Sequence, residues 1–358
     1  MIHLDPSWLQ HVEKPARYMG GEWNSVAKNH SEVDVTMAFA FPDVYEVSMS
    51  HLGIKILYGI VNERLDAAAE RVFAPWHDME AEMRNRDIPL FSLETKTPIR
   101  DFDLLAFTLQ YEMCYTNIIN MLDLADIPFY GKDRDLSFPL LIGGGPCVYN
   151  MEPIADFFDV VSIGESEDWI NEFIDLYKAE KEKGFPGGKE AFLRKAAQIE
   201  GTYIPSLYEP QYTESGDFAG MKVLAEEAPA IVKKRIVEDM EAAFYPTKPV
   251  VPYLDIVHDR AVLELFRGCL RGCRFCQAGM LYRPVRERTP ERLVQLAKEI
   301  IANTGYNEIS LMSLSSADYS KLPELVDMLM EEFKDKQVSV SLPSLRIDAF
   351  SIDIAKKV

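Results

Sequence analysis

Residues 33–177 alternate short apolar runs with longer segments of helical spacing, and this alternation limits the fold more than any other feature of the chain. Strands that alternate with helices form βαβ units, in which the strands lie parallel in one sheet. The predicted strands are 35–40, 71–74, 104–109, 139–142 and 160–163. The predicted helices are a segment with Ile54, Leu57, Tyr58 and Val61 at helical spacing, followed by 78–85, 117–125 and 168–177. We therefore expect an α/β protein with a flavodoxin-like or Rossmann-like parallel sheet.

Small and polar residues follow several of these strands, at the edge where such sheets bind ligands. Thr108 and Leu109 end the third strand, and the glycine run Gly143, Gly144 and Gly145 follows the fourth. A glycine run lets a backbone approach a bulky ligand closely, although glycine-rich turns are also ordinary in loops that bind nothing. The edge is therefore a candidate cofactor site, with ordinary loop structure as the alternative.

The spacing C-x3-C-x2-C of Cys269, Cys273 and Cys276 predicts a metal site. One short loop with three thiolates can hold three corners of an iron–sulfur cube and leave the fourth iron open to a small chelating molecule. Gly268 and Gly272 precede two of the cysteines, where the missing Cβ permits positive φ.

Charged and aromatic residues complete the cysteine loop. Arg267, Arg271 and Arg274 put positive charge beside thiolates that must stay deprotonated. Phe275, directly before Cys276, is expected to shield the cluster from water or to pack on a flat ligand.

A structural zinc site and three unrelated core thiols are the alternatives to a cluster. Structural zinc takes four ligands, and no cysteine or histidine follows Cys276. His258 is the nearest upstream candidate, and the remote Cys114 and Cys147 could contribute only if the chain folded back. Spacing and loop composition together favour an iron–sulfur cluster.

The motif C-x3-C-x-aromatic-C resembles that of the radical S-adenosylmethionine (SAM) enzymes. The resemblance implies a 4Fe-4S cluster with Cys269, Cys273 and Cys276 as its ligands. It also implies that SAM chelates the open iron and is cleaved to methionine and a 5′-deoxyadenosyl radical, which abstracts hydrogen from a substrate. An electron donor such as flavodoxin or ferredoxin is the partner implied.

Residues 256–358 predict the opening of a (β/α) barrel, with a first strand at 261–266. Thr289 and Pro290 are the expected N-cap and first turn of the following helix, which should stop at Gly305. Two more strands are predicted at 308–314 and through Val338, Val340 and Leu342. Barrel chemistry gathers at the carboxyl ends of the strands, where the first strand delivers the cysteine loop.

By the same resemblance, SAM is expected at the ends of the second and third strands of the barrel. After the second come Ser315, Ser316 and Asp318, where family members bind the methionine amino group, often with a G-G-E-like motif that this sequence lacks. After the third comes Arg346, which could pair with the SAM carboxylate in a bidentate fork. A loop salt bridge is the alternative role for this arginine.

The sheet that precedes this motif resembles that of the cobalamin-binding radical SAM proteins, most clearly over 153–167. The resemblance implies that Thr108, Leu109 and the run Gly143, Gly144 and Gly145 border the nucleotide tail of cobalamin. Domains that ligate cobalt with histidine carry D-x-H-x-x-G, whereas alignment on Gly53 puts Ser48 and Ser50 at the Asp and His positions. His51 is offset by one residue and is expected to face elsewhere. Either cobalt has no histidine ligand here, or the domain keeps the fold without cobalamin.

Composition is consistent with a large cytoplasmic enzyme. With 358 residues and 47% hydrophobic content, the chain can bury two cores. The net charge, 38 − 57 = −19, disfavours an extended nucleic-acid-binding surface but is compatible with a local basic patch. Five cysteines without even spacing favour a reducing compartment over a disulfide framework. The sequence shows neither a membrane-spanning stretch nor a signal-peptide pattern.

The expected organisation is an N-terminal arm (1–32), a sheet domain of the cobalamin-binding type (33–177), a connector (178–255) and a partial barrel (256–358). About three strand–helix units of the barrel are present, roughly half of those in a radical SAM barrel. We therefore expect either a truncated product or a second polypeptide that completes the barrel.

The predicted function is reductive SAM cleavage followed by hydrogen abstraction from an unidentified substrate, with cobalamin-dependent methyl transfer or rearrangement as a further expectation. One alternative is a methylthiotransferase-like radical SAM protein that does not use cobalamin. Another is a non-catalytic iron–sulfur scaffold or a fragment that needs a partner subunit.

Overall fold

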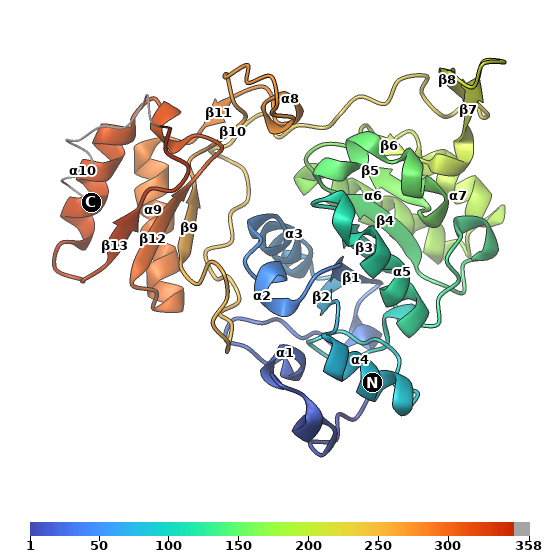
Figure 1. The fold of residues 1–358 in the computed structure, drawn as a ribbon, viewed down its shortest axis with the longest axis horizontal. Helices are drawn as coiled ribbons and strands as arrows, with labels where there is room; N and C mark the ends of the chain where they lie inside the picture. Colours follow the sequence, from blue (N-terminus) through green and yellow to red (C-terminus); the bar gives the residue numbers. More distant parts are fainter. Residues whose placement is uncertain (347–358) are drawn as a thin grey trace. The chain divides into compact units, whose positions relative to one another are not determined.

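The computed structural model describes residues 1–346, which form two compact units (Figure 1). The first unit comprises Met1–Gly21 and Ser25–Ile236, and the second comprises Glu22–Asn24 and the chain from Val237 onward. The first unit extends past the predicted boundary at 177 because later elements pack onto the sheet domain. Trp169 donates a hydrogen bond from Nε1 to Thr202 Oγ1 at 2.7 Å and so ties the last helix of the predicted domain to the following strand.

The first unit is built on a six-stranded sheet in the order β2-β1-β3-β4-β5-β6. Its strands are β1 (Val35–Phe41), β2 (Ala67–Phe73), β3 (Leu104–Thr108), β4 (Leu140–Gly144), β5 (Val160–Ser162) and β6 (Thr202–Tyr203). The first five strands run parallel, and β6 pairs antiparallel with β5. The predicted α/β fold is confirmed, and the order 2-1-3-4-5 is the flavodoxin-like one of the two alternatives.

The second strand is longer than predicted. It begins at Ala67, and all seven of its residues are buried. Three alanines and Glu70 open this strand, and such residues favour helices over strands. Parallel pairing with β1, in which Ala67 lies opposite Val35, overrides this local preference.

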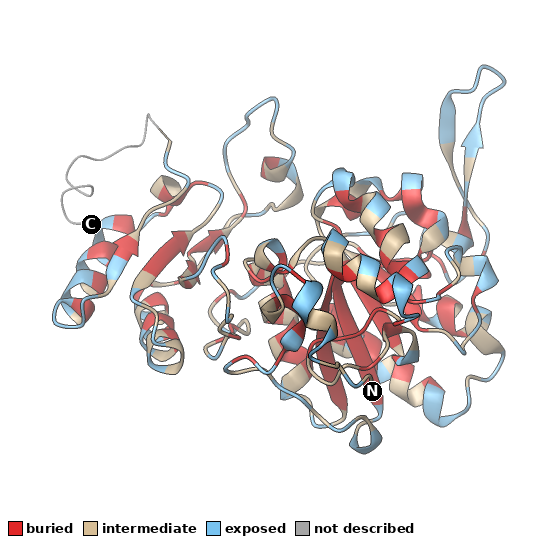
Figure 2. Cartoon of the chain, turned by 60° about the horizontal axis from the view of Figure 1, so that its bottom comes forward, coloured by how far each residue is buried: buried red, intermediate tan, exposed pale blue. Residues whose placement is uncertain are grey.

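Helices cover this sheet, so its strands are buried on both faces, as is usual for parallel sheets (Figure 2). The four predicted helices are present as α3 (Leu52–Glu63), α4 (His77–Asn85), α5 (Tyr115–Leu124) and α6 (Glu167–Glu182). The remaining α-helices and strands of this unit are α1 (Ala16–Met19), α2 (Tyr45–Ser48), α7 (Gly188–Ala196), β7 (Tyr208–Tyr212) and β8 (Phe218–Val223). The last two strands form an antiparallel hairpin.

The second unit contains three parallel strands in the order β13-β12-β9. Their bounds are β9 (Ala261–Glu264), β12 (Glu308–Met312) and β13 (Ser339–Ser341), and the connecting helices are α9 (Pro290–Thr304) and α10 (Leu322–Phe333). The predicted first strand is split, because after β9 the chain turns into β10 (Phe266–Arg267), which pairs antiparallel with β11 (Arg286–Glu287). A short helix, α8 (Ala278–Leu281), lies between β10 and β11.

The predicted ends of the first barrel helix are confirmed. Thr289 caps α9, since its side chain accepts a hydrogen bond from Arg292 N. At the other end, Gly305 adopts φ 74°, which ends the helix. Trp23 Nε1 and Asn24 Nδ2 both donate to the carbonyl of Asn303 at 3.1 Å, so part of the predicted N-terminal arm satisfies a carbonyl in the last turn of α9.

The edge of β9 opposite β12 is covered by a segment of the predicted connector. The hydroxyl of Tyr245 donates to Val262 O at 2.8 Å and accepts from Glu264 N at 3.0 Å. Arg288 reaches the same segment and donates to Met240 O at 2.7 Å. The hydroxyl of Tyr245 thus forms the hydrogen bonds with β9 that a neighbouring strand would otherwise form at this edge.

Replacing Tyr245 by phenylalanine is expected to lower the free energy of unfolding of the second unit by about 1–3 kcal/mol, because a partly buried carbonyl and a partly buried amide lose their partner. Amide hydrogen exchange at Glu264 and thermal unfolding would measure the effect. Tyr212→Phe, at a tyrosine that is 64% exposed, is the matched control and should leave both unchanged. Unaltered exchange at Glu264 in the Tyr245 variant would contradict this assignment.

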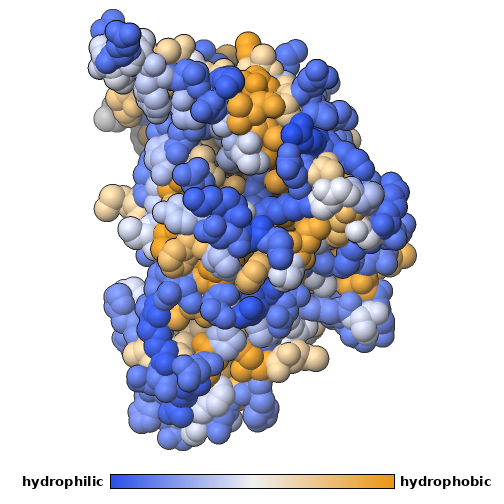
Figure 3. Space-filling model, turned by 90° about the vertical axis from the view of Figure 1, so that its right-hand side faces the viewer, coloured by the Kyte–Doolittle hydropathy of each residue, from blue (hydrophilic) through white to orange (hydrophobic). Residues whose placement is uncertain are grey.

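The molecular surface is largely hydrophilic on the face shown in Figure 3, where separate hydrophobic patches lie among polar side chains. Within residues 1–346, no helix combines the length and the apolar character needed to cross a membrane.

Candidate functional site

The cysteine loop lies where the sequence predicted, after the first strand of the parallel sheet in the second unit. Cys269 and Cys276 are partly exposed, Cys273 is exposed, and all three are free thiols. Cys276 N donates to Cys273 O at 3.0 Å, which closes a tight turn between the second and third cysteines. The loop therefore presents three reduced sulfurs at the carboxyl end of β9.

The donor set of this loop fits an iron–sulfur cluster. Soft thiolates are the ligands that such clusters take, and Cys269, Cys273 and Cys276 are all accessible from solvent. Among residues 1–346, no three His, Cys, Asp or Glu side chains already converge as metal ligands. The three sulfurs are expected to converge only when they coordinate a cluster, because uncoordinated thiols gain no stabilisation from close approach.

The two glycines of the loop have different roles. Gly268 has φ 94°, and a Cβ there would lie 2.6 Å from Pro284 O and 2.8 Å from Tyr282 O. The predicted need for positive φ is confirmed at this position. Gly272 is not among the residues with positive φ, and a Cβ there would meet no atom within 4 Å. Conformation and packing therefore require only the first of these glycines.

Two arginines of the cysteine loop donate hydrogen bonds to carboxylates. Arg267 Nε donates to Glu264 Oε1 at 3.0 Å, and Arg271 Nε donates to Asp318 Oδ2 at 2.9 Å. The positive charge predicted beside the thiolates is thus partly balanced by acidic residues of β9 and of the segment after β12. Phe275 is 92% exposed, so its ring is free to cover a cluster or a flat ligand, and this role stays a prediction.

The predicted SAM contacts after β12 lie close to the cysteine loop, because Asp318 binds Arg271 of that loop. Ser315 and Ser316 are buried, and Ser316 Oγ donates to Leu311 O at 3.0 Å. The Arg271 guanidinium is the main reason why the pKa of Asp318 is lowered, and the charge of Arg346 contributes in the same direction. The structure therefore brings Asp318 near both arginines.

At the carboxyl edge of the first unit, most of the predicted cofactor residues have structural roles. Leu109 is fully buried, and its amide donates to Gly144 O at 2.7 Å. Gly145 has φ 106°, and a Cβ there would lie 2.7 Å from Leu109 O. A Cβ on Gly143 would press on the Phe158 ring at 3.2 Å. Packing within the chain thus accounts for three of these residues.

Gly144 differs from its neighbours, since a Cβ there would meet no atom within 4 Å. It ends β4 beside Thr108, the last residue of β3. Open space beside a strand end is what a cofactor that approaches the backbone requires. Of the predicted glycine run, Gly144 is therefore the position at which the edge is open.

The sequence predicts that His51 faces away from a cobalt ligand position, and this stays a prediction. His51 is the N-cap of α3, and its Nδ1 accepts from Ile54 N at 3.3 Å. Its ring lies 5.4 Å from that of Phe41 at the end of β1. Desolvation lowers the pKa of His51 to about 4, although the nearby Gln110 side chain, which follows β3, acts to raise the pKa. The imidazole is thus neutral at physiological pH.

His51 and Gln110 therefore mark the point between β1 and β3 where the strand order reverses, which is the usual ligand position in such sheets. Alignment on Gly53 places Ser50, and not His51, at the histidine position of D-x-H-x-x-G. The structure shows that His51 is instead the N-cap of α3.

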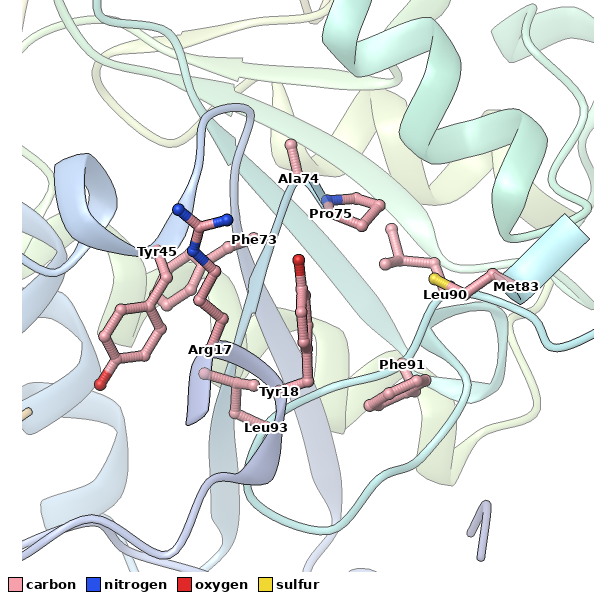
Figure 4. Close-up of a pocket in the computed structure, with 10 residues that line it drawn as sticks. All are labelled: Arg17, Tyr18, Tyr45, Phe73, Ala74, Pro75, Met83, Leu90, Phe91 and Leu93. Atoms are coloured by element: carbon pink, nitrogen blue, oxygen red, sulfur yellow. The ribbon is translucent and has the colours of Figure 1, made fainter. Parts of the chain in front are cut away.

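A small cavity in the first unit lies apart from these residues, beside α1 and the end of β2 (Figure 4). Its lining includes Arg17, Tyr18, Phe73, Leu90 and Phe91. A volume of about 20 Å³ holds roughly one water molecule and excludes a cofactor.

Two family models match the chain. The model described as "Radical SAM proteins, N-terminal" matches residues 53–205, and the model of the radical SAM superfamily matches residues 263–358, which include the three cysteines. An uncharacterized protein of Methanocaldococcus jannaschii is 29% identical over 282 residues, which cover 77% of this chain and 52% of that protein. The chain thus spans about half the length of this relative.

Two solved structures of the radical SAM methyltransferase TsrM from Kitasatospora setae are similar to this chain. One TsrM structure, with cobalamin and a [4Fe-4S] cluster bound, has 12% sequence identity and a TM-score of 0.49, and the match covers 90% of this chain and 57% of TsrM. A second, with tryptophan substrate and a SAM analogue bound, has 13% identity with the same TM-score and coverage. Together with the cysteine loop at the end of β9, the two family matches show that the chain belongs to the radical SAM superfamily of enzymes.

Proposed function

We propose that Cys269, Cys273 and Cys276 hold a [4Fe-4S] cluster at which SAM is reductively cleaved to methionine and a 5′-deoxyadenosyl radical. The observation that carries the proposal is the position of three reduced, accessible cysteines on one loop at the carboxyl end of β9. A cluster held by these three cysteines would supply an open iron for the SAM amino and carboxylate groups and one electron for reductive cleavage of the carbon–sulfur bond. An external one-electron donor such as flavodoxin or ferredoxin replaces that electron.

The residues after β12 and β13 are proposed to orient SAM. The Ser316 hydroxyl is already bonded to Leu311 O and Ser313 Oγ. The carbonyls of Ser315 and Ser316 each accept one backbone hydrogen bond and keep a second lone pair, so they are the proposed acceptors for the SAM ammonium. Arg346 offers a guanidinium to the SAM carboxylate.

Anaerobic reconstitution with iron and sulfide tests the central proposal. About four irons per chain are expected, and the addition of SAM and dithionite should release 5′-deoxyadenosine. Zinc binding without iron would contradict the proposal. Cluster formation without SAM cleavage would favour the alternative, an iron–sulfur scaffold.

We also propose that the first unit binds cobalamin at its carboxyl edge, near Gly144 and His51. Support comes from the open space at Gly144 and from the position of His51 between β1 and β3. His51 already uses Nδ1 to cap α3, so the proposal does not require it to ligate cobalt. Bound cobalamin would add methyl transfer or rearrangement to the chemistry of the radical.

Titration of the cluster-free chain with hydroxocobalamin separates this proposal from the methylthiotransferase-like alternative. A change in the visible spectrum is expected, and Gly144→Val should weaken binding by about tenfold or more, because the side chain fills the open space. Gly272→Val, at an equally open glycine of the second unit, is the control and should bind cobalamin normally. An unchanged cobalamin spectrum with the unmodified chain would rule out cobalamin binding.

A further inference from the structure

We propose that Arg271 and Asp318 form a latch that positions the cysteine loop against the segment after β12. The inference rests on the proposed function of that loop as the cluster site. It assigns Asp318 a positioning role in place of the predicted contact with SAM.

The geometry of the pair is that of a two-pronged fork. Arg271 Nε donates to Asp318 Oδ2 at 2.9 Å, and Arg271 Nη2 donates to Asp318 Oδ1. Bidentate arginine–carboxylate pairs fix orientation as well as distance. Arg271 lies between the first two cysteines, so the fork holds the loop at its centre.

The two halves of the latch differ in how firmly the rest of the protein holds them. On the Asp318 side, Asp318 N donates to Ser315 O at 2.8 Å. The next residue, Tyr319, is 3% exposed, and its hydroxyl donates to the main-chain carbonyl of Arg288 at 2.7 Å. Its ring also stacks parallel to that of Phe266. Asp318 is therefore attached to a buried, hydrogen-bonded segment.

The cysteine loop is exposed by comparison. Leu270 is 81% exposed, Phe275 is 92% exposed, and Cys273 is exposed as well. A loop with little buried surface depends on few contacts for its position. The fork to Asp318 thus links an exposed loop to a rigid anchor on the neighbouring strand.

The position of the latch gives it a function. β9 and β12 are adjacent parallel strands, with Leu263 opposite Leu311, so the loops that follow them lie at the same edge of the sheet. Three sulfurs must converge when a cluster binds, and a loop that is already positioned loses less conformational freedom in doing so. The latch therefore favours retention of the cluster.

The chain offers a matched control at the opposite ends of the same two strands. Arg260, just before β9, pairs with Glu308, the first residue of β12, at 2.5 Å. Each pair joins a segment next to β9 with β12 or with the segment after it, and both pairs are partly exposed. Removal of either pair should weaken the strand pairing in a similar way, but only removal of the latch should release the cysteine loop.

The test compares Asp318→Asn, Arg271→Gln, the double variant Arg271→Asp with Asp318→Arg, and the control Glu308→Gln. In the cluster-free chain, chymotryptic cleavage after Phe275 should be about fivefold faster in both single variants, which corresponds to the loss of one partly exposed ion pair. The charge-reversed double variant should restore slow cleavage, and Glu308→Gln should match the unmodified chain. In the reconstituted chain, iron loss to a ferrous chelator should follow the same order.

The outcomes separate the latch from the proposed function. Unchanged cleavage in both single variants overturns the latch. A second outcome also overturns the latch: the KM for SAM rises in Asp318→Asn while Arg271→Gln retains iron normally. That pattern would show that Asp318 contacts SAM itself. The expected cleavage pattern in a chain that takes up no iron supports the latch and overturns the cluster.

Discussion

Replacement of Cys273 by alanine is expected to abolish cluster binding and SAM cleavage together. Cys273 is the middle ligand of C-x3-C-x2-C, and its removal leaves two thiolates for a cube that needs three. Iron should fall below about one atom per reconstituted chain. Release of 5′-deoxyadenosine should drop by at least about a hundredfold, since loss of an outer-shell partner alone often costs ten- to a hundredfold. Iron analysis and chromatography of the products measure both effects.

The two remaining cysteines supply the control for this experiment. Cys114 and Cys147 are buried in the first unit, at 2% and 7% exposure. Burial raises the pKa of both thiols, that of Cys147 to about 11, so neither is a ready thiolate at neutral pH. Cys114→Ala and Cys147→Ala should therefore keep the full iron content. Normal iron in Cys273→Ala, or its loss in Cys147→Ala, would refute the ligand assignment.

The second large effect is expected from Gly268→Ala. At φ 94° an alanine is strained, and its Cβ would meet the carbonyl oxygens of Pro284 and Tyr282 at 2.6 and 2.8 Å. Relief of this clash requires a shift of the chain just before Cys269, at a cost of about 2–4 kcal/mol. Because the first ligand moves with the backbone, we expect most of the cluster to be lost even though every cysteine remains.

Gly272→Ala is the matched control for this glycine. It lies in the same loop, directly before Cys273, but its Cβ would have no neighbour within 4 Å. Iron content and the visible absorption of the reconstituted cluster should be normal in Gly272→Ala and strongly reduced in Gly268→Ala. Equal behaviour of the two variants would show that the conformation of Gly268 is not what positions Cys269.

Local sequence patterns predicted most of the secondary structure. The alternation of apolar runs and helical spacing located all five parallel strands of the first unit. The N-cap at Thr289 and the stop at Gly305 were correct to the residue, because the hydrogen bonds that set them lie within three or four residues of sequence. The alanine-rich start of β2 was missed, since its strand conformation depends on pairing with β1.

Among the candidate site residues, some were predictable from local sequence and others depend on tertiary packing. The three cysteines are recognisable from sequence because cluster ligands on one loop need a short, fixed spacing. The position of His51 at the sheet edge depends on how α3 begins beside β1 and β3, which no spacing rule contains. Gly144, rather than its two neighbours, is open because of packing by residues distant in the chain.

The sequence by itself determined the α/β class and the cysteine loop. It also determined that this loop follows a strand of a parallel sheet. All three depend on the order of residues along the chain. Only the tertiary structure decided that Asp318 binds Arg271, that Tyr245 covers the edge of β9 and that residues 22–24 belong to the second unit. Each of these contacts joins residues distant in sequence. Their partners are chosen by strand order and packing, and local pattern carries no information about either.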